Sequence, residues 1–194
     1  MHRRHALSFL LATAAAGCMD SKPAFKAVDI TGAEYARDFP LPDTTGRMRS
    51  VKDFQGKAVV VFFGFTQCHD VCPTTLTELS TARQLLGADG ARVQGIFVTV
   101  DPERDTPQVL QAYLANFGPD YVGLRGTPEQ LAAVAKDFKI YYKKVEGKTP
   151  GSYTMDHSAA SYVYDPQGRL RLYTRYGSGA KALADDLKIL LAEK

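Results

Sequence analysis

The chain has 194 residues, enough for one domain of ordinary size. Apolar residues make up 45% and charged residues 23%, a globular composition that argues against a disordered or low-complexity chain. The formal net charge is only +3, and two of these charges, on Arg3 and Arg4, lie in a segment that we expect to be removed. Nucleic-acid binding needs a basic surface, so we expect no nucleic-acid partner.

The start of the chain is typical of an export signal. A short basic head is followed by the uncharged residues 6–16, a run too short for a membrane-spanning helix, which takes about 20 residues. The sequence Ala-Ala-Gly-Cys that ends at Cys18 resembles the processing site of a bacterial lipoprotein, although Ala15 stands where a larger aliphatic residue is more usual. We therefore expect residues 1–17 to be a removed signal peptide and Cys18 to carry the lipid. A plain secretory signal with an incidental cysteine is the alternative.

A single α/β domain is predicted for residues 39–194, preceded by the lipid anchor and a polar, flexible tether over residues 18–38. In chain order we expect short paired strands at 39–41 and 48–51, a buried strand at 58–65, a helix at 73–86, a second buried strand at 93–100, helices at 106–117 and 127–138 around a short strand at 122–124, an extended segment at 141–145, a loop at 146–156, a hairpin of strands 161–164 and 170–175, and a helix at 180–191. This alternation predicts a central mixed sheet with helices on both faces, an antiparallel edge hairpin and an extra N-terminal hairpin.

Two cysteines, Cys68 and Cys72, lie in the polar turn between the first buried strand and its helix. A disulfide that closes so short a loop stabilises a fold little, and a helix N-terminus lowers the pKa of nearby thiols, so we expect a reactive pair. A helical spacing would place both sulfurs on one side, close enough to form a reversible disulfide or to hold one soft metal ion. The alternative, two core cysteines, fits poorly because such cysteines would replace apolar residues inside the strand or helix.

Two histidines remain after the signal, His69 and His157. His69 stands between the cysteines, a spacing that makes it unsuited to point inward with both sulfurs. His157 precedes the closing hairpin, and in a thioredoxin-like arrangement that segment faces the turn that carries the cysteines. Asp101 ends the second buried strand and therefore lies at the same edge of the sheet. The alternatives are a surface-loop histidine and a simple Asp-Pro turn.

Three motifs occur in order, GKAVVVFFGFTQCHDVCPTTLTEL, VTVDPERDTPQVLQAY and DHSAASYVYDPQGRL. Together they resemble the Sco/SenC family over residues 28–194. Members of that family are thioredoxin-like, membrane-tethered copper proteins involved in building the CuA centre of cytochrome c oxidase. The resemblance implies that Cys68, Cys72 and His157 bind copper. It also implies that Asp101 supports the ligands from outside or has another functional role, rather than being a firm ligand.

The sequence departs from the family pattern beside the cysteines. His69 stands where many members carry proline, and Gln67 stands where many carry histidine, which leaves the three implied ligands in place. Two thiolates and an imidazole suit copper, and Cu(I) in particular, although Cu(II) stays open. A structural zinc site takes four protein ligands, and calcium or magnesium takes oxygen ligands, so these metals fit less well.

Two functions fit these features. The first is a copper-binding metallochaperone without turnover, which delivers copper to the oxidase subunit that carries CuA and could also reduce that subunit, with other copper chaperones as further partners. The second is an enzyme, a thiol–disulfide oxidoreductase that uses Cys68 and Cys72 to reduce exported proteins. His157 favours the first function, because disulfide exchange needs no imidazole. With Cys18 lipidated, we expect the protein at the bacterial cell membrane, facing the periplasm or the exterior.

Overall fold

The structure is a computed structural model that describes residues 24–193. The expected signal peptide, residues 1–17, and the lipidated Cys18 lie outside the described residues, so both remain predictions. Among the residues that are described, no helix is both long enough and apolar enough to cross a membrane.

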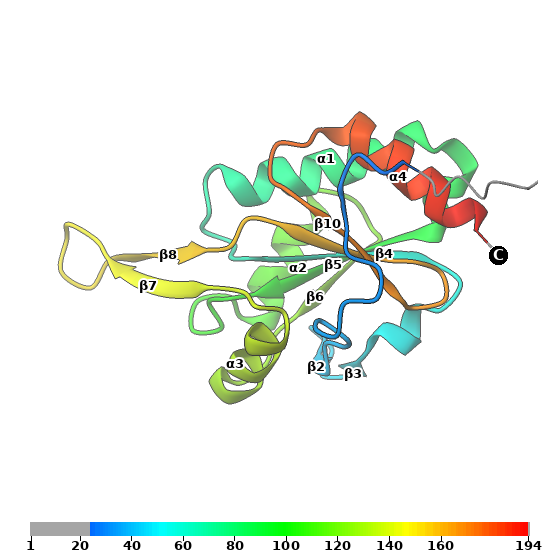
Figure 1. The fold of residues 1–194 in the computed structure, drawn as a ribbon. Coiled ribbons are helices and arrows are strands. Elements are labelled where there is room, and N and C mark those ends of the chain that lie inside the picture. The colour runs from blue at the N-terminus through cyan, green and yellow to red at the C-terminus, as the bar shows by residue number, and fades with distance from the viewer. Residues whose placement is uncertain (1–23, 194) are drawn as a thin grey trace, which may run out of the picture.

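A six-stranded mixed sheet forms the centre of the domain, with the strand order β1-β10-β9-β4-β5-β6 (Figure 1). Its strands are β1 (Val28–Asp29), β4 (Ala58–Gly64), β5 (Val93–Thr99), β6 (Tyr121–Leu124), β9 (Ser161–Tyr164) and β10 (Leu170–Thr174). Strands β4, β5 and β6 are parallel, and β9 and β10 form the predicted antiparallel hairpin beside β4. Every residue of β4 and β5 is buried, which explains their nearly continuous apolar sequences.

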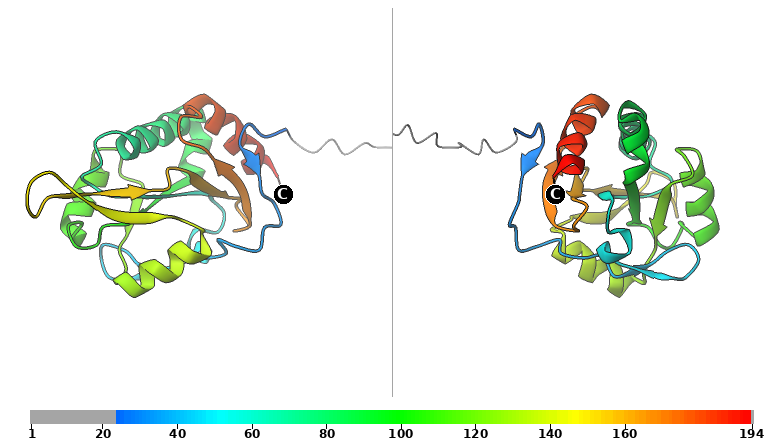
Figure 2. Two further views of the ribbon diagram at one scale, coloured as in Figure 1. Left: turned by 60° about the vertical axis from the view of Figure 1, so that its left-hand side comes forward. Right: turned by 90° about the vertical axis from the view of Figure 1, so that its right-hand side faces the viewer.

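Helices cover both faces of this sheet, as predicted. They are α1 (Val71–Leu85), α2 (Pro107–Ala115), α3 (Pro128–Asp137) and α4 (Ala180–Ala192), with short 3₁₀ helices η1 (Val51–Phe54) and η2 (Gly87–Arg92). Helices α1 and α4 lie side by side on one face, and α3 lies on the other (Figures 1 and 2). Strands β2 (Leu41–Pro42) and β3 (Met48–Arg49) form the predicted N-terminal hairpin. Two buried clusters of apolar side chains hold these layers together.

A third pair of strands was not predicted. Strands β7 (Tyr142–Glu146) and β8 (Tyr153–His157) form an antiparallel hairpin that projects from the body of the domain (Figure 1). The prediction of a loop over residues 146–156 was therefore wrong. Alternate residues of β8 are half-buried and exposed, but only one of the half-buried residues, Met155, is purely apolar. The period-two pattern that identifies a strand is for this reason weak in the sequence.

Residues 24–38, which we expected to belong to a flexible tether over residues 18–38, pack on the domain, whereas residues 18–23 lie outside the described residues. Within residues 24–38, β1 pairs with β10, and several scattered apolar side chains pack on the two core clusters. The backbone amides of Lys26 and Ala27 donate hydrogen bonds of 2.7 and 2.8 Å to the buried carboxylate of Asp186 in α4. The polar composition of the segment conceals these contacts, because their partners lie far away in the sequence.

Candidate metal centre

The turn between β4 and α1 holds both cysteines. Cys68 lies in the turn and is half-buried, whereas Cys72 lies in the first turn of α1 and is fully buried. The expected helical spacing was wrong in one respect, because α1 begins at Val71 and Cys68 precedes it. The Cys68 sulfur instead accepts a hydrogen bond of 3.3 Å from the backbone amide of Cys72. This sulfur therefore lies at the helix N-terminus, where unpaired amides and the helix dipole favour negative charge.

Gly64, the last residue of β4, makes room for the buried sulfur. A Cβ atom there would lie 2.7 Å from the Cys72 sulfur, 2.8 Å from the Phe62 ring and 3.0 Å from the Phe97 ring. Side-chain carbons do not approach other atoms so closely, so a glycine is needed for Cys72 to pack directly against the strand. This role was not predicted, although a glycine within an apolar, β-branched strand is a signal of close approach.

His157, the last residue of β8, turns its ring toward the sulfurs. Its Nε2 atom lies 3.6 Å from the Cys72 sulfur, and its Nδ1 atom lies 2.9 Å from the carbonyl oxygen of Ser158. A carbonyl oxygen only accepts, so Nδ1 donates its proton there and Nε2 faces the sulfurs. The rings of Phe62 and Phe65 pack edge-on against the imidazole, at centroid distances of 6.0 and 5.7 Å. These contacts hold the imidazole in an orientation that suits metal binding.

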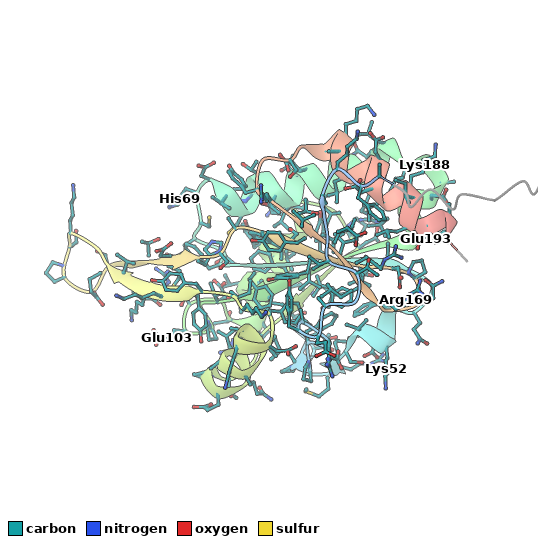
Figure 3. The ribbon with its side chains drawn as sticks, viewed as in Figure 1. Lys52, His69, Glu103, Arg169, Lys188 and Glu193 are labelled. Atoms are coloured by element: carbon teal, nitrogen blue, oxygen red, sulfur yellow. The ribbon has the colours of Figure 1, made fainter. Side chains whose placement is uncertain are left out.

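Cys68, Cys72 and His157 meet at one end of the sheet, as the sequence predicted. Their two sulfurs and one ring nitrogen lie within 4.8 Å of one another. Cys68 and His157 line a pocket between the cysteine-bearing turn and residues 154–157 of β8, and Cys72 lies buried behind it. His69 is exposed at the same end of the molecule and is not a member of this group (Figure 3). Three soft donors fit copper, and Cu(I) in particular, better than calcium, magnesium or a structural zinc ion.

The two thiols share a hydrogen bond, which drives their pKa values apart. A hydrogen bond from the Cys72 side chain lowers the pKa of Cys68 to about 3, and further hydrogen bonds from His157 and two backbone amides help to outweigh burial. The same shared hydrogen bond, together with burial, raises the pKa of Cys72. At neutral pH the metal-free pair therefore holds one thiolate, on the more exposed sulfur, and one thiol, on the buried sulfur.

Two buried aspartates lie near the turn, and only one of them was expected. Asp101 forms an ion pair with Arg104 and accepts a hydrogen bond of 2.9 Å from the Tyr153 hydroxyl, so its contacts lead to hairpin β7–β8. Asp105 is fully buried and accepts hydrogen bonds from the amide and the hydroxyl of Thr66, 3.1 and 2.6 Å long. Burial raises the pKa of Asp105. Asp105, which was not predicted, is thus the aspartate that holds the cysteine-bearing turn.

Comparison with known proteins places this arrangement in a family. Residues 28–192 match the family described as SCO1/SenC. The chain belongs to the SCO1/SenC family. Its thioredoxin-like fold, with a cysteine-bearing turn and a histidine at one end of a mixed sheet, agrees with the resemblance from which the ligands were predicted.

Individual relatives of this SCO1/SenC protein support the assignment. The mitochondrial SCO2 homologue of Bos taurus is 42% identical over 147 residues, which cover 75% of this chain and 54% of the bovine protein. The structure of Bradyrhizobium japonicum ScoI with copper bound is 41% identical, with a TM-score of 0.71, and the match covers 79% of this chain and 97% of that one. BsSco, described with a disulfide switch and as a member of the Sco family of cytochrome c oxidase assembly proteins, shares the fold at 22% identity and a TM-score of 0.64, over 86% of this chain and 99% of that one.

Proposed function

We propose that this SCO1/SenC protein carries copper and delivers it to the CuA-bearing subunit of a cytochrome c oxidase during assembly. The observation that carries the proposal is the group of Cys68, Cys72 and His157, whose ligand atoms lie within 4.8 Å of one another. The copper bound to the 41% identical ScoI supports copper as the cargo. Three ligands beside an open pocket leave the ion accessible, so a receiving protein's ligands can replace them in turn.

Copper binding is tested by titrating residues 24–194 with Cu(I). This fragment contains the whole sheet and both buried clusters, so it keeps the core. We expect one copper ion per reduced chain and no binding by Cys68→Ser or Cys72→Ser. His157→Ala should lower the affinity by more than about 100-fold, because even the loss of a residue that only supports a ligand costs 10–100-fold. His69→Ala, which removes an exposed histidine at the same end, is the matched control and should bind normally. Unchanged affinity in His157→Ala would rule out the three-ligand site.

Delivery requires a second experiment, in which the copper-loaded fragment is mixed with a reduced, metal-free CuA domain. After separation of the two proteins, copper analysis is expected to show transfer to the CuA domain. A copper-loaded chelator of matched affinity serves as the control for passive release. If the chelator donates copper as fast as the fragment does, the protein contributes no delivery step, and the proposed chaperone function is wrong even though copper binds.

The state of the thiols favours thiol–disulfide exchange as a second candidate function. The Cys68 sulfur is half-exposed with its pKa lowered to about 3, and the Cys72 thiol lies buried behind it. The Cys68 thiolate would attack a disulfide of an exported protein, and Cys72 would then attack the mixed disulfide, which releases a reduced protein and leaves a Cys68–Cys72 disulfide. We infer that this disulfide is reversible and excludes copper. Thiol counting on the oxidised fragment, with a parallel copper titration, tests the inference, and full copper uptake by the oxidised protein would contradict it.

We also propose that Cys18 anchors the mature protein to a bacterial cell membrane on its non-cytoplasmic side, after removal of residues 1–17. The support is the uncharged run that ends in Ala-Gly-Cys. A membrane anchor would keep the carrier close to a membrane-bound acceptor and so raise its effective concentration. Cell fractionation of Cys18→Ser should show unprocessed or released protein. A Cys18→Ser protein that stays processed and membrane-bound would overturn the lipoprotein assignment.

A further inference from the structure

Arg104 contacts both elements that carry the three ligands, the cysteine-bearing turn and the strand that ends at His157. One of its terminal nitrogens, Nη1, donates hydrogen bonds of 3.0 Å to the side-chain oxygen of Gln67 and 2.8 Å to the backbone carbonyl of Tyr153. Gln67 directly precedes Cys68 in the turn, and Tyr153 begins the strand that ends at His157. A single guanidinium therefore joins the thiol-bearing turn to the histidine-bearing strand.

The guanidinium is held in place from several sides. Its Nε atom pairs with the carboxylate of Asp101, which is 3% exposed, and Asp101 also receives the Tyr153 hydroxyl at 2.9 Å. Its central carbon lies 3.6 Å from the centre of the Tyr153 ring and 5.9 Å from the centre of the Phe65 ring. The Phe65 ring in turn packs edge-on against His157. Arg104 thus lies against one aromatic ring beside the cysteine-bearing turn, Phe65, and one in the histidine-bearing strand, Tyr153. These contacts favour a single orientation of the guanidinium.

Hairpin β7–β8 needs such a side-chain connection, because its two strands form a sheet of their own. In the described part of the chain, β7 and β8 pair with each other and not with the central sheet. Hydrogen bonds between Tyr141 and Ser158 close the base of the hairpin, and the rest projects beyond the body (Figure 1). Tyr153 lies on the projecting part, where no backbone hydrogen bonds join β8 to the central sheet in the described chain. Its contacts with Arg104 and Asp101 therefore restrain this part of the strand.

We propose that Arg104 is a positioning residue, which sets the separation between the cysteine-bearing turn and His157 and thereby completes the three-ligand site. The inference rests on the proposed function, since it takes His157 as a copper ligand. It assigns Asp101 an indirect part, as the carboxylate that orients the guanidinium. Without Arg104 the two thiols stay in the turn, while the strand that carries the imidazole loses its hydrogen-bonded link to that turn through Gln67.

A double-mutant cycle on residues 24–194 separates this role from general support of the fold. Cu(I) affinity is measured for wild type, Arg104→Ala, His157→Ala and the double variant. We expect Arg104→Ala to lower the affinity about tenfold, the size typical of a residue that orients a metal ligand. In the His157→Ala background the same substitution should change the affinity less than about twofold, because no imidazole is left to position. Arg104→Lys should resemble Arg104→Ala, since a single ammonium cannot bond Gln67 and Tyr153 and also keep the contact that Nε makes with Asp101.

A measurement without copper checks the same proposal. Amide hydrogen exchange of the metal-free protein should become faster in β8 in Arg104→Ala, while exchange in β4 and β5 stays as in wild type. Arg47→Ala is the control for loss of an arginine, because the Arg47 side chain is 64% exposed and pairs with Asp53 on the surface. It should leave both copper affinity and β8 exchange unchanged.

The outcomes distinguish failure of the inference from failure of the function. If His157→Ala weakens copper binding and Arg104→Ala does not, Arg104 has no positioning role and the proposed function stands. If Arg104→Ala weakens binding equally with and without His157, its effect does not pass through the imidazole, and the inference is wrong. If His157→Ala binds copper normally, the three-ligand function fails, and the role of Arg104 fails with it.

Discussion

The two ends of the domain, marked in Figure 3 by Arg169 and Glu193 and by His69, differ in how completely their buried polar groups are paired. At the end that carries Arg169 and Glu193, charges are paired: the Arg171 guanidinium, 10% exposed, contacts the carboxylates of both Asp165 and Glu193. Arg169 adds a second ion pair to Asp165, which is itself fully buried. Removing one member of such a group leaves a buried charge without a partner, so substitutions at this end should lower the free energy of unfolding.

At the other end, where Figure 3 labels His69, the polar groups are incompletely paired. The Cys72 sulfur and the His157 nitrogen lie 3.6 Å apart, and Cys68 is half-buried. The buried hydroxyl of Tyr113 has no hydrogen-bond partner among the described residues. Donors that the chain does not satisfy internally remain available to a ligand. We therefore expect substitutions among the ion pairs to lower the free energy of unfolding without changing copper affinity, and substitutions of the ligands to do the reverse.

The largest expected effect is the loss of copper-linked stability in Cys68→Ser. With free Cu(I) at about 1,000 times its dissociation constant, wild type should gain about 4 kcal/mol in free energy of unfolding. Cys68→Ser should gain nothing, because one of three ligands is missing, and its metal-free stability serves as the baseline for this comparison. Urea unfolding with and without Cu(I) measures both numbers. A variant that keeps the full gain would show that Cys68 is not a ligand.

Arg171→Met should show the reverse pattern. It leaves the buried carboxylate of Asp165 short of a partner, so the free energy of unfolding should fall by about 3 kcal/mol. Copper affinity should stay within twofold of wild type, because the ion pairs lie at the far end. Arg169→Ala is the matched control: its side chain is 58% exposed, and its loss should cost less than about 1 kcal/mol. Equal losses for the two variants would contradict the comparison.

Gly64→Ala should affect stability and copper binding together, because Gly64 contacts the site from inside the sheet. The added methyl would lie 2.7 Å from the Cys72 sulfur, so the sulfur, Phe62 or the strand must shift. Overpacking of this kind costs about 2 kcal/mol. Urea unfolding and Cu(I) titration should both show a decrease. A stability loss with unchanged copper affinity would mean that the sulfur keeps its place and the rings move instead.

Asp186→Asn should have a smaller effect. The Asp186 carboxylate accepts the amides of Lys26 and Ala27, and an amide side chain offers only one acceptor oxygen. We expect a loss of about 1 kcal/mol in free energy of unfolding and faster hydrogen exchange over residues 24–29. Asp185→Asn, which changes a neighbouring carboxylate that pairs with exposed Lys181, serves as the control. Exchange that stays slow at residues 24–29 would show that β1 pairing alone holds the segment.

The last test concerns pH. The pKa of Cys68 is lowered to about 3 from an ordinary 9.0, so between these values the folded chain holds a thiolate where the unfolded chain holds a thiol. This thiolate contributes stability that is complete above pH 9 and is lost as the pH falls toward 3. The raised pKa of Cys72 acts in the opposite sense above pH 9, so stability should fall again as the pH rises beyond that value. Iodoacetamide at pH 5 should alkylate Cys68 alone, as read by mass spectrometry; equal alkylation of Cys72 would contradict the assignment.

The parts of the fold that the sequence predicts are those fixed by neighbouring residues. Thr106 and Thr127 each cap a helix with a proline at its first position, and both helices were predicted to start there. Both central strands were predicted as well, because each is a continuous apolar run within its own few residues. Of the site, the Cys-x-x-x-Cys spacing was visible locally. His157 was reached through the thioredoxin-like arrangement and then the motif resemblance, because 85 positions separate it from Cys72.

The parts that were missed depend on distant partners. Residues 24–38 are ordered by α4 and β10, and neither contact leaves a local pattern. Asp105 and Arg104 belong to a polar stretch that is typical of a turn, and their roles follow from Thr66, 39 positions away from Asp105, and Tyr153, 49 positions away from Arg104. The reactive groups stand out in one sequence, but the residues that hold them in place are set by contacts that form only in the folded sheet.

Because residues 24–38 pack on the domain, they also limit how far the domain can lie from a membrane anchor at Cys18. Only residues 19–23 separate Cys18 from the first described residue, and an extended chain advances at most about 3.6 Å per residue. A lipid on Cys18 would hold the near end of the domain within about 20 Å of the bilayer. That end lies opposite hairpin β7–β8 (Figures 1 and 2), so the ligand group would face away from the membrane. The distance of the copper from the bilayer would then be set by the length of the domain. An acceptor site would have to lie at a similar distance from the bilayer to receive the copper.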